Sequence, residues 1–353
     1  MTPTIFLTGA TGYTGGTVLN TLVTAHPEYD IIVLLRKPIA SFSDAYPGVK
    51  VLLGDFDSIE LLKEAASKAD IVIHHGNSDY APAVKALIAG VIERAQASKP
   101  AFYIHLGGTA IIADYNNLGE LGPKVWSDVN DLDAIWSFPA EAIHRETELL
   151  IQEAWTKYGD NLKTAIVCPP NMHGRGTGPG RVDSFYVPSF LSESVKLGAT
   201  FYVGSGSNIY SRAHVEDVAQ VFLKLVEAAV DGGQGAEWGH QIAEDYVLTI
   251  GNQGYYFTAV EEISQYDIAA AVGKILKAQG QLPSEVPRQV SLEELDSMLT
   301  YIPLEGTARL LFGSNSRSKP DRAQKLLGYN PQRRSFLESL EEDLSGAVKL
   351  SQK

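Results

Sequence analysis

Three glycines at three-residue spacing, Gly9, Gly12 and Gly15, directly follow a short apolar run near the start of the chain. The run is typical of a buried strand, and residues 14–25 carry apolar side chains at helical spacing. Strand, glycine turn and helix together make a phosphate-binding loop, because glycine lets the backbone approach a pyrophosphate and the helix N-terminus offers free N–H groups. The stretch predicts dinucleotide binding through Gly9, Thr11, Gly12, Tyr13, Thr14 and Gly15; the alternative is a tight turn without a ligand.

Strand-like and helix-like segments alternate through the first half of the chain. Apolar runs at residues 31–35, 49–53, 71–73, 102–106 and 164–167 are separated by amphipathic segments at 59–68, 82–97 and 140–155. This alternation predicts an α/β fold, a doubly wound parallel sheet of the Rossmann type with helices on both faces. Ligands of such folds collect at the carboxyl ends of the strands, so the residues just past each strand are the candidates for a site.

Composition narrows the class of protein. The net charge of −13 over 353 residues argues against a nucleic-acid or anionic-membrane surface, and no apolar run approaches the ~18–20 residues of a membrane span. The single cysteine, Cys168, excludes an internal disulfide, and no leader segment precedes the first strand. We therefore expect a cytoplasmic protein with a small-molecule substrate, present as a monomer or homodimer.

The end of the second predicted strand selects between two dinucleotides. Arg36 lies 21 residues past Gly15, where an acid would bond the ribose of NAD and an arginine suits the 2′-phosphate of NADP. The sequence predicts that NADP(H) is preferred over NAD(H). The alternative is a solvated charged loop.

Residues past the third and fourth strands are further cofactor candidates. Asp55 and Phe56 are placed to meet the adenine amino group and ring face, and His75 and Gly76 follow the next strand. His74 and His75 have no partner at metal-ligand spacing, so no metal site is predicted.

Motifs along almost the whole chain resemble the extended and atypical short-chain dehydrogenase/reductase superfamily, in its NAD(P)-dependent epimerase/dehydratase-like branch. They occur in the family's order, at residues 8–15, at Asp55, and at residues 169–174, 204–206, 212–219 and 325–331. The resemblance implies that Pro169 and Met172 border the cofactor. It also implies that His173 stands beside the nicotinamide, where the family often has a tyrosine.

The family's catalytic residues are not retained at the matching positions. Members usually carry a hydroxyl past strand five, then a tyrosine and a lysine four residues apart on the next helix. Here the spacing to Pro169 puts Ala140 at the tyrosine position and His144 at the lysine position, with Gly108 where the hydroxyl belongs. The Tyr-x-x-x-Lys motif is therefore absent, and its proton-transfer chemistry does not carry over.

Four side chains are candidates for the missing catalytic role: Thr109, Tyr115, His144 and His173. A histidine titrates near neutral pH and can exchange a proton, and a hydroxyl can bond a substrate oxygen. Tyr186 and Arg212 are candidates for substrate contact. Each has a plainer alternative as a surface, loop or backbone-bonded residue.

Two domains follow from the change of pattern after Arg175. We expect a dinucleotide-binding domain at residues 1–174, joined by 204–255, and a smaller, mostly helical C-terminal substrate lobe at 175–203 and 256–353. A last core strand is predicted at 247–250.

The combined expectation is an enzyme, an NADP(H)-dependent oxidoreductase of the atypical short-chain dehydrogenase/reductase type that acts on a small carbonyl or alcohol metabolite. Two alternatives stay open. One is epimerase/dehydratase-type or non-redox chemistry on the same fold, and the other is an NADP(H)-binding sensor or regulatory protein without catalysis.

Overall fold

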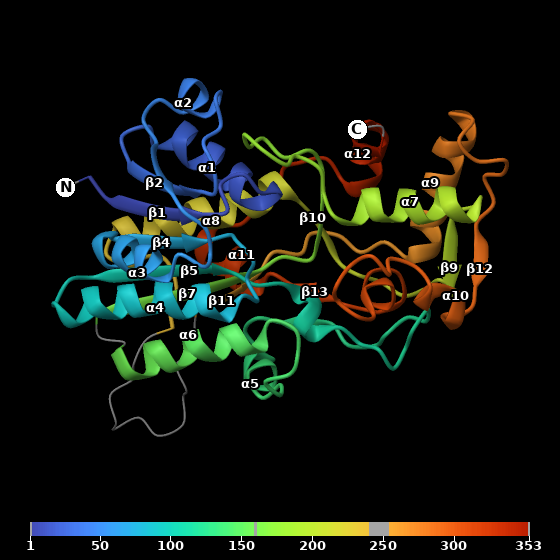
Figure 1. Ribbon diagram of the computed structural model, residues 1–353. Coiled ribbons are helices and arrows are strands. Elements are labelled where there is room, and N and C mark those ends of the chain that lie inside the picture. Colours follow the sequence, from blue (N-terminus) through green and yellow to red (C-terminus); the bar gives the residue numbers. More distant parts are fainter. Residues whose placement is uncertain (1, 159–160, 240–253, 352–353) are drawn as a thin grey trace.

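Seven parallel strands form the central sheet of the computed structural model, which describes residues 2–158, 161–239 and 254–351 (Figure 1). Their order is β11-β7-β5-β4-β1-β2-β3. The order reverses between β1 and β4, which is the point where a doubly wound sheet opens a crevice for a ligand. The bounds are β1 Thr4–Thr8, β2 Asp30–Leu35, β3 Lys50–Leu53, β4 Ile71–His74, β5 Ala101–Leu106, β7 Leu162–Cys168 and β11 Tyr255–Phe257.

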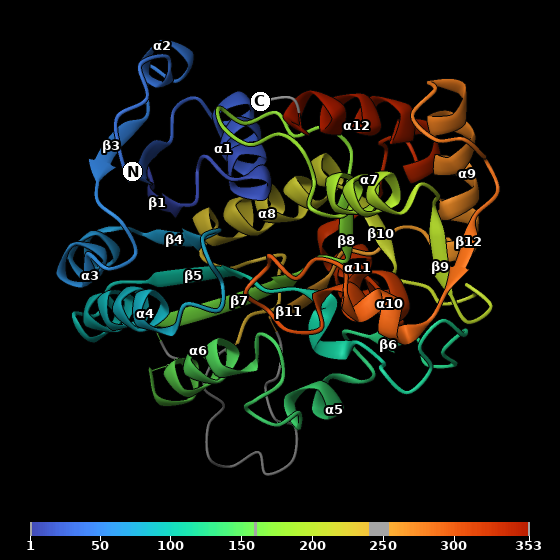
Figure 2. The same cartoon turned by 45° about the vertical axis from the view of Figure 1, so that its right-hand side comes forward.

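Helices cover both faces of this sheet (Figure 2). One face carries α1 (Tyr13–Ala25), α8 (Val215–Val230) and α11 (Asp321–Leu327), and the other carries α3 (Ile59–Lys68), α4 (Ala81–Gln96) and α6 (Arg145–Tyr158). The remaining elements of this part are α2 (Phe42–Ala45), the 3-10 turn η1 (Thr109–Ile112) and α5 (Leu132–Trp136). The predicted fold class is confirmed.

The first strand explains why the sheet needs helices on both sides. Ile5 and Leu7 point into the core beneath α1 and α8, while Phe6 points into the core beneath α3 and α4, and all three are 0% exposed. Successive side chains of a strand point to opposite faces, so a continuous apolar run must be buried on both.

A second, smaller core lies at one side of the sheet, to the right in Figure 1. It is built from α7 (Tyr186–Leu197), α9 (Gln265–Ala278), α10 (Leu292–Asp296), the π-helical turn η2 (Arg309–Gly313) and α12 (Phe336–Ser351). Three short parallel pairs complete the fold: β8 (Asn171–His173) with β10 (Arg212–His214), β9 (Phe201–Val203) with β12 (Arg288–Val290), and β6 (Trp126–Ser127) with β13 (Ser318–Lys319).

The structure differs from the sequence-based expectations in two places. The helix expected over 140–155 begins only at Arg145, so residues 140–144 form a turn before it. Residues 321–329, assigned to the lobe, pack with Ala323, Leu327 and Tyr329 into the core beneath α8. The strand expected at 247–250 lies outside the described residues. Among the described helices, none combines the length and apolar character that a bilayer crossing requires.

Candidate active site

The turn between β1 and α1 is closed too tightly for any side chain at two of its glycines. Gly9 has a left-handed φ of 76°, and a Cβ there would lie 2.4 Å from the carbonyl oxygen of His75. A Cβ on Gly15 would lie 2.4 Å from the Gly9 carbonyl oxygen. Helix α1 then begins at Tyr13 with Gly12 as its N-cap, without a capping side chain. Its first amides are therefore available to an anion such as a pyrophosphate.

A hollow of about 340 Å³ lies beside this turn. It is lined by Thr11 of the glycine loop and by four residues at the end of β2, namely Leu35, Arg36, Lys37 and Ile39. Arg36 and Lys37 are exposed, and neither forms an ion pair with any described residue. Two unpaired cations in a hollow next to a phosphate-binding turn fit a further phosphate group.

The predicted adenine residues lie together past β3 and β4. The ring of Phe56 covers Gly76, since a Cβ on Gly76 would lie 2.1 Å from its Cζ, and the ring meets that of His74 at a centroid distance of 5.7 Å. Asp55 Oδ1 accepts a hydrogen bond of 2.8 Å from the Ser58 hydroxyl, which lowers the pKa of Asp55. The carboxylate stays charged, with its backbone turn held in place.

His75 forms a wall of the glycine loop rather than an acid–base group. Its ring packs against Phe222 at 4.2 Å, and the side chain is 6% exposed. Burial lowers its pKa to about 3, so the ring is neutral. Its carbonyl and Cβ are the parts that approach Gly9 and Gly15.

The start of α1 is tied to the segment that follows β7. The Tyr13 hydroxyl lies 2.8 Å from the carbonyl oxygen of His173 and 2.6 Å from that of Gly174. Thr14 Oγ1 lies 3.7 Å from the Met172 sulfur. The structure thus brings Tyr13, Thr14 and Met172 together.

His144 stands outside the helix on which the sequence placed it. It precedes Arg145 with a left-handed φ of 71°, because the helix starts one residue later. Its Nδ1 lies 2.8 Å from Asp79 Oδ1, so Nδ1 donates a hydrogen to the carboxylate. The His144 Nε2 would lie 2.7 Å from a Cβ on Gly108, so the histidine does sit against the turn after β5. Nε2 there lies where it could bond a ribose hydroxyl.

The hydroxyl of Thr109 lies in a small buried group at the ends of β5 and β7. The Thr109 amide bonds the Pro169 carbonyl at 3.1 Å, and Thr109 Oγ1 lies 3.5 Å from the Tyr210 hydroxyl. Ser316 donates to the Thr109 carbonyl at 2.7 Å. Tyr115 is 43% exposed. It is one of the titratable groups whose negative charge, when ionised, would raise the pKa of Tyr210. Sequence reasoning missed Tyr210, and no signal in its spacing marks it.

The two predicted substrate residues form a separate cluster. The guanidinium of Arg212 lies 4.0 Å from the ring centroid of Tyr186 and 4.3 Å from that of Phe336. Arg212 is 1% exposed, and its Nε and Nη1 have no hydrogen-bond partner among the described residues. The Tyr186 hydroxyl donates to Gln265 at 2.8 Å. The two aromatic rings and the charge of Glu261 stabilise the buried cation.

His173 contacts the cluster of Arg212, Tyr186 and Phe336, and it does not contact the Thr109 group. Its Nδ1 lies 2.9 Å from Ser339 Oγ and its Nε2 lies 3.1 Å from Glu261 Oε1, with the side chain 1% exposed. The Ser339 hydroxyl is also bonded within its own helix, to the Ser335 carbonyl at 3.0 Å. Both ring nitrogens of His173 are thus engaged in holding α12, and they do not reach toward Thr109.

A buried carboxyl group lies directly beneath the turn after β5. Glu148 is 0% exposed, and its Oε1 lies 3.1 Å from the Tyr255 hydroxyl and 3.8 Å from Cys168 Sγ. Burial raises its pKa to about 7. A Cβ on Gly107 would lie 2.8 Å from the same sulfur, so this cluster explains why the turn needs glycine at that position.

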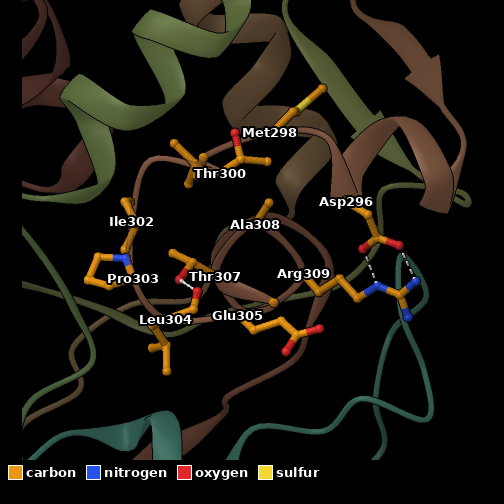
Figure 3. A pocket seen from close by; sticks show the side chains of 12 residues that line it. Asp296, Met298, Thr300, Ile302, Pro303, Leu304, Glu305, Thr307, Ala308 and Arg309 are labelled. Atoms are coloured by element: carbon orange, nitrogen blue, oxygen red, sulfur yellow. Dashed lines mark hydrogen bonds and ion pairs between the residues drawn. The ribbon is translucent and has the colours of Figure 1, made fainter.

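Another hollow, of about 650 Å³, lies in the lobe around residues 298–309 (Figure 3). Met298, Ile302, Pro303 and Leu304 line it, and Asp296 and Arg309 form an ion pair at its side. None of the residues singled out from the sequence lines this hollow, so it stands apart from the candidate site.

Comparison with known proteins shows which proteins this chain is similar to. The model of the NAD dependent epimerase/dehydratase family matches residues 141–239. Over these residues the chain is similar to the NAD dependent epimerase/dehydratase family. A curated relative, the oxidase ucsJ of an Acremonium species, is 29% identical over 94% of this chain and 93% of its own length.

Solved structures share the fold of this chain across nearly its whole length. The dTDP-glucose 4,6-dehydratase DesIV of Streptomyces venezuelae, solved with NAD, has a TM-score of 0.63 at 16% identity, covering 97% of this chain and 95% of its own. The UDP-glucose 4-epimerase of Thermotoga maritima has a TM-score of 0.60 at 14% identity, covering 99% of this chain and 100% of its own. At such identities the likeness concerns the fold alone.

Proposed function

We propose that this protein is an NADP(H)-dependent oxidoreductase that acts on a small carbonyl or alcohol metabolite. The observation that carries the cofactor assignment is the hollow beside Thr11, with the exposed cations Arg36 and Lys37 on its wall. The extra phosphate of NADP(H) is the group that two unpaired cations at this point of the fold would hold. The redox assignment is supported by a relative of nearly equal length that is named an oxidase.

Different residues would contact different parts of the bound dinucleotide. The amides at the start of α1 hold the pyrophosphate, the close packing at Gly9 and Gly15 lets it approach, and Phe56 with Gly76 borders the adenine. Pro169 and Met172 border the other end of the cofactor. When bound, the nicotinamide exchanges a hydride with the substrate carbon.

Two residues of the chain then act at the reacting end. His144 accepts a hydrogen bond from the ribose through Nε2, with its ring oriented by Asp79. Thr109 places its hydroxyl at the ends of β5 and β7, where it would border the substrate oxygen. Arg212 and Tyr186 belong to the lobe, where two guanidinium nitrogens of Arg212 without hydrogen-bond partners among the described residues could bond a polar group of the substrate.

A second candidate function is a cofactor sensor without catalysis. It is favoured by Ala140 and His144, which stand where the family carries its tyrosine and lysine. A sensor would bind NADPH and leave it unchanged.

The test is a titration of nicotinamide fluorescence with NADPH and then NADH, followed by a panel of aldehydes, ketones and quinones. We expect NADPH to bind at least about ten-fold more tightly than NADH, which is ~1.4 kcal/mol. We also expect its absorbance to fall with one or more carbonyls. Binding of neither dinucleotide would overturn every proposal made for the site. Tight binding of NADPH without its oxidation would favour the sensor.

Replacement of His144 by alanine should weaken NADPH binding about five- to ten-fold, the worth of one hydrogen bond of ~1 kcal/mol. His144→Asn is the control for the backbone, because asparagine tolerates the left-handed conformation that His144 adopts. Loss of affinity in both variants assigns the effect to the imidazole. Affinity and turnover equal to the wild type in both would remove His144 from the site.

A further inference from the structure

A phenol lies where the end of β5 meets the end of β7, although the family's tyrosine position is occupied by Ala140. Tyr210 is 8% exposed, and its hydroxyl lies 3.5 Å from Oγ1 of Thr109, the predicted substrate-bonding hydroxyl. The Ser316 hydroxyl is a second neighbour and donates to the Thr109 carbonyl at 2.7 Å. Three hydroxyl-bearing residues from distant parts of the chain thus converge at one point of the sheet edge.

The backbone holds this phenol in place from two sides. The Ser211 carbonyl, next to Tyr210, accepts from the Asn171 amide at 3.1 Å, just past the end of β7. The Ser211 amide donates to the Ser316 carbonyl at 2.9 Å. On the other side of Tyr210 the Ser316 amide donates to the Ile209 carbonyl at 2.9 Å, so Tyr210 forms a parallel bridge with Ser316 and its backbone is held on both sides. A donor held in this way is pre-organised for a bound ligand.

The hydrogen-bond directions leave the phenolic hydrogen for that ligand. Thr109 donates from Oγ1 to the Tyr210 oxygen, and Ser316 donates to the Thr109 carbonyl, so both neighbours use their own hydrogens inside the group. The Tyr210 O–H is then the donor that remains for an incoming oxygen.

We propose that Tyr210 is the proton donor to the substrate oxygen, in place of the tyrosine that the family carries on its helix. The inference rests on the proposed function, the reduction of a carbonyl with NADPH. The substrate carbon gains a hydride, the carbon–oxygen π bond breaks, and its electron pair takes the proton of the Tyr210 O–H. The cofactor is oxidised, the carbonyl is reduced to an alcohol, and the phenolate recovers a proton from water.

The other candidate donors are held differently. His144 has its Nδ1 bonded to Asp79, and its Nε2 lies against Gly108. The Tyr13 hydroxyl donates to backbone carbonyls. Tyr115 is 43% exposed, and no side-chain hydrogen bond to the described residues fixes its hydroxyl. Of these side chains, Tyr210 alone combines burial with contact to Thr109.

A distinct pH dependence follows from this donor. Burial raises the pKa of Tyr210 to about 12, and the titratable or charged groups that act on it are Tyr115, Cys168 and Arg212. The protonated phenol is present below its pKa and is lost as the pH rises through it. The rate of reduction should therefore stay constant from about pH 6 to pH 9, whereas a histidine donor would lose rate as the pH rises through about 6.5.

The experiment compares Tyr210→Phe with Tyr202→Phe, the same loss of a hydroxyl on β9 of the lobe, where Tyr202 contacts Tyr266. Three quantities are measured with the ketone or aldehyde that the wild type reduces fastest. They are kcat with NADPH, the Kd of NADPH, and the Kd of that carbonyl compound in the unreactive complex with NADP⁺. For Tyr210→Phe we expect kcat to fall at least about 100-fold. We expect the carbonyl Kd to rise about five- to ten-fold and the NADPH Kd to change less than about two-fold.

Each outcome decides one claim. A Tyr210→Phe enzyme that keeps its kcat and carbonyl Kd overturns the role of Tyr210 and leaves the proposed function standing. A wild-type rate that falls through neutral pH also overturns it, even if the variant does not fold. A wild type that reduces no carbonyl in the panel overturns the proposed function itself, and this inference with it. Equal losses in Tyr202→Phe would assign the effect to the lobe's stability.

Discussion

Gly9→Ala should lower the free energy of unfolding by about 3 kcal/mol and abolish measurable NADPH binding. A left-handed alanine costs about 1–2 kcal/mol more than glycine, and the φ of Gly9 is 76°. The added Cβ would also lie 2.4 Å from a backbone oxygen, that of His75, which no rotamer change can relieve. Forced overpacking of this kind typically costs a further ~1–3 kcal/mol. Denaturant unfolding measures the first effect, and nicotinamide fluorescence measures the second.

Gly48→Ala is the matched control, because a Cβ there would meet nothing within 4 Å and the residue is not left-handed. Its stability should stay within about 0.5 kcal/mol of the wild type. Normal stability and normal NADPH binding of Gly9→Ala would contradict the geometry of the turn and its place in the cofactor site.

Arg36→Asp should reverse the cofactor preference by about 1,000-fold, which is ~4 kcal/mol in the ratio of the two dissociation constants. The variant removes a cation from the hollow beside Thr11 and puts a carboxylate there, which repels a 2′-phosphate and can bond a 2′-hydroxyl. NADPH should bind about 100-fold more weakly, and NADH about ten-fold more tightly. Fluorescence titration of both dinucleotides against both proteins gives the ratio directly.

Lys99→Asp makes the same change of charge at an exposed turn before β5 and should leave both dissociation constants within about two-fold. An Arg36→Asp protein that still prefers NADPH would place the 2′-phosphate elsewhere. If the control shifted the preference equally, the effect would belong to the overall charge and not to the hollow.

The sheet was predictable because its signal is local. Each buried strand is a short apolar run, and each covering helix has apolar residues at helical spacing. The glycine turn comes directly after the first strand. The same holds for the cofactor side, where Gly9, Arg36, Phe56 and Gly76 each come just past a strand. Parallel strands bring such residues to one edge, so the sequence alone predicts that they meet.

The reacting end was less predictable because it depends on contacts far apart in the chain. His144 was expected on a helix, but the helix starts one residue after it. The residue type does not predict its left-handed φ, as a glycine would. Thr109 and Tyr210 are 101 residues apart, and only the pairing of β8 with β10 brings them together. His173 follows a strand as expected, yet α12 draws its ring away toward Ser339.

The attachment of the Gly174 amide to Asp343, 169 residues later in the chain, has a consequence for biosynthesis. At about 5–20 residues per second, a ribosome needs roughly ten to thirty seconds to add that much chain. Throughout this interval the nascent protein already contains the glycine turn but lacks the carboxylate that anchors the neighbouring segment. A cotranslational pulse of NADPH should therefore find few competent binding sites until α12 has been synthesised.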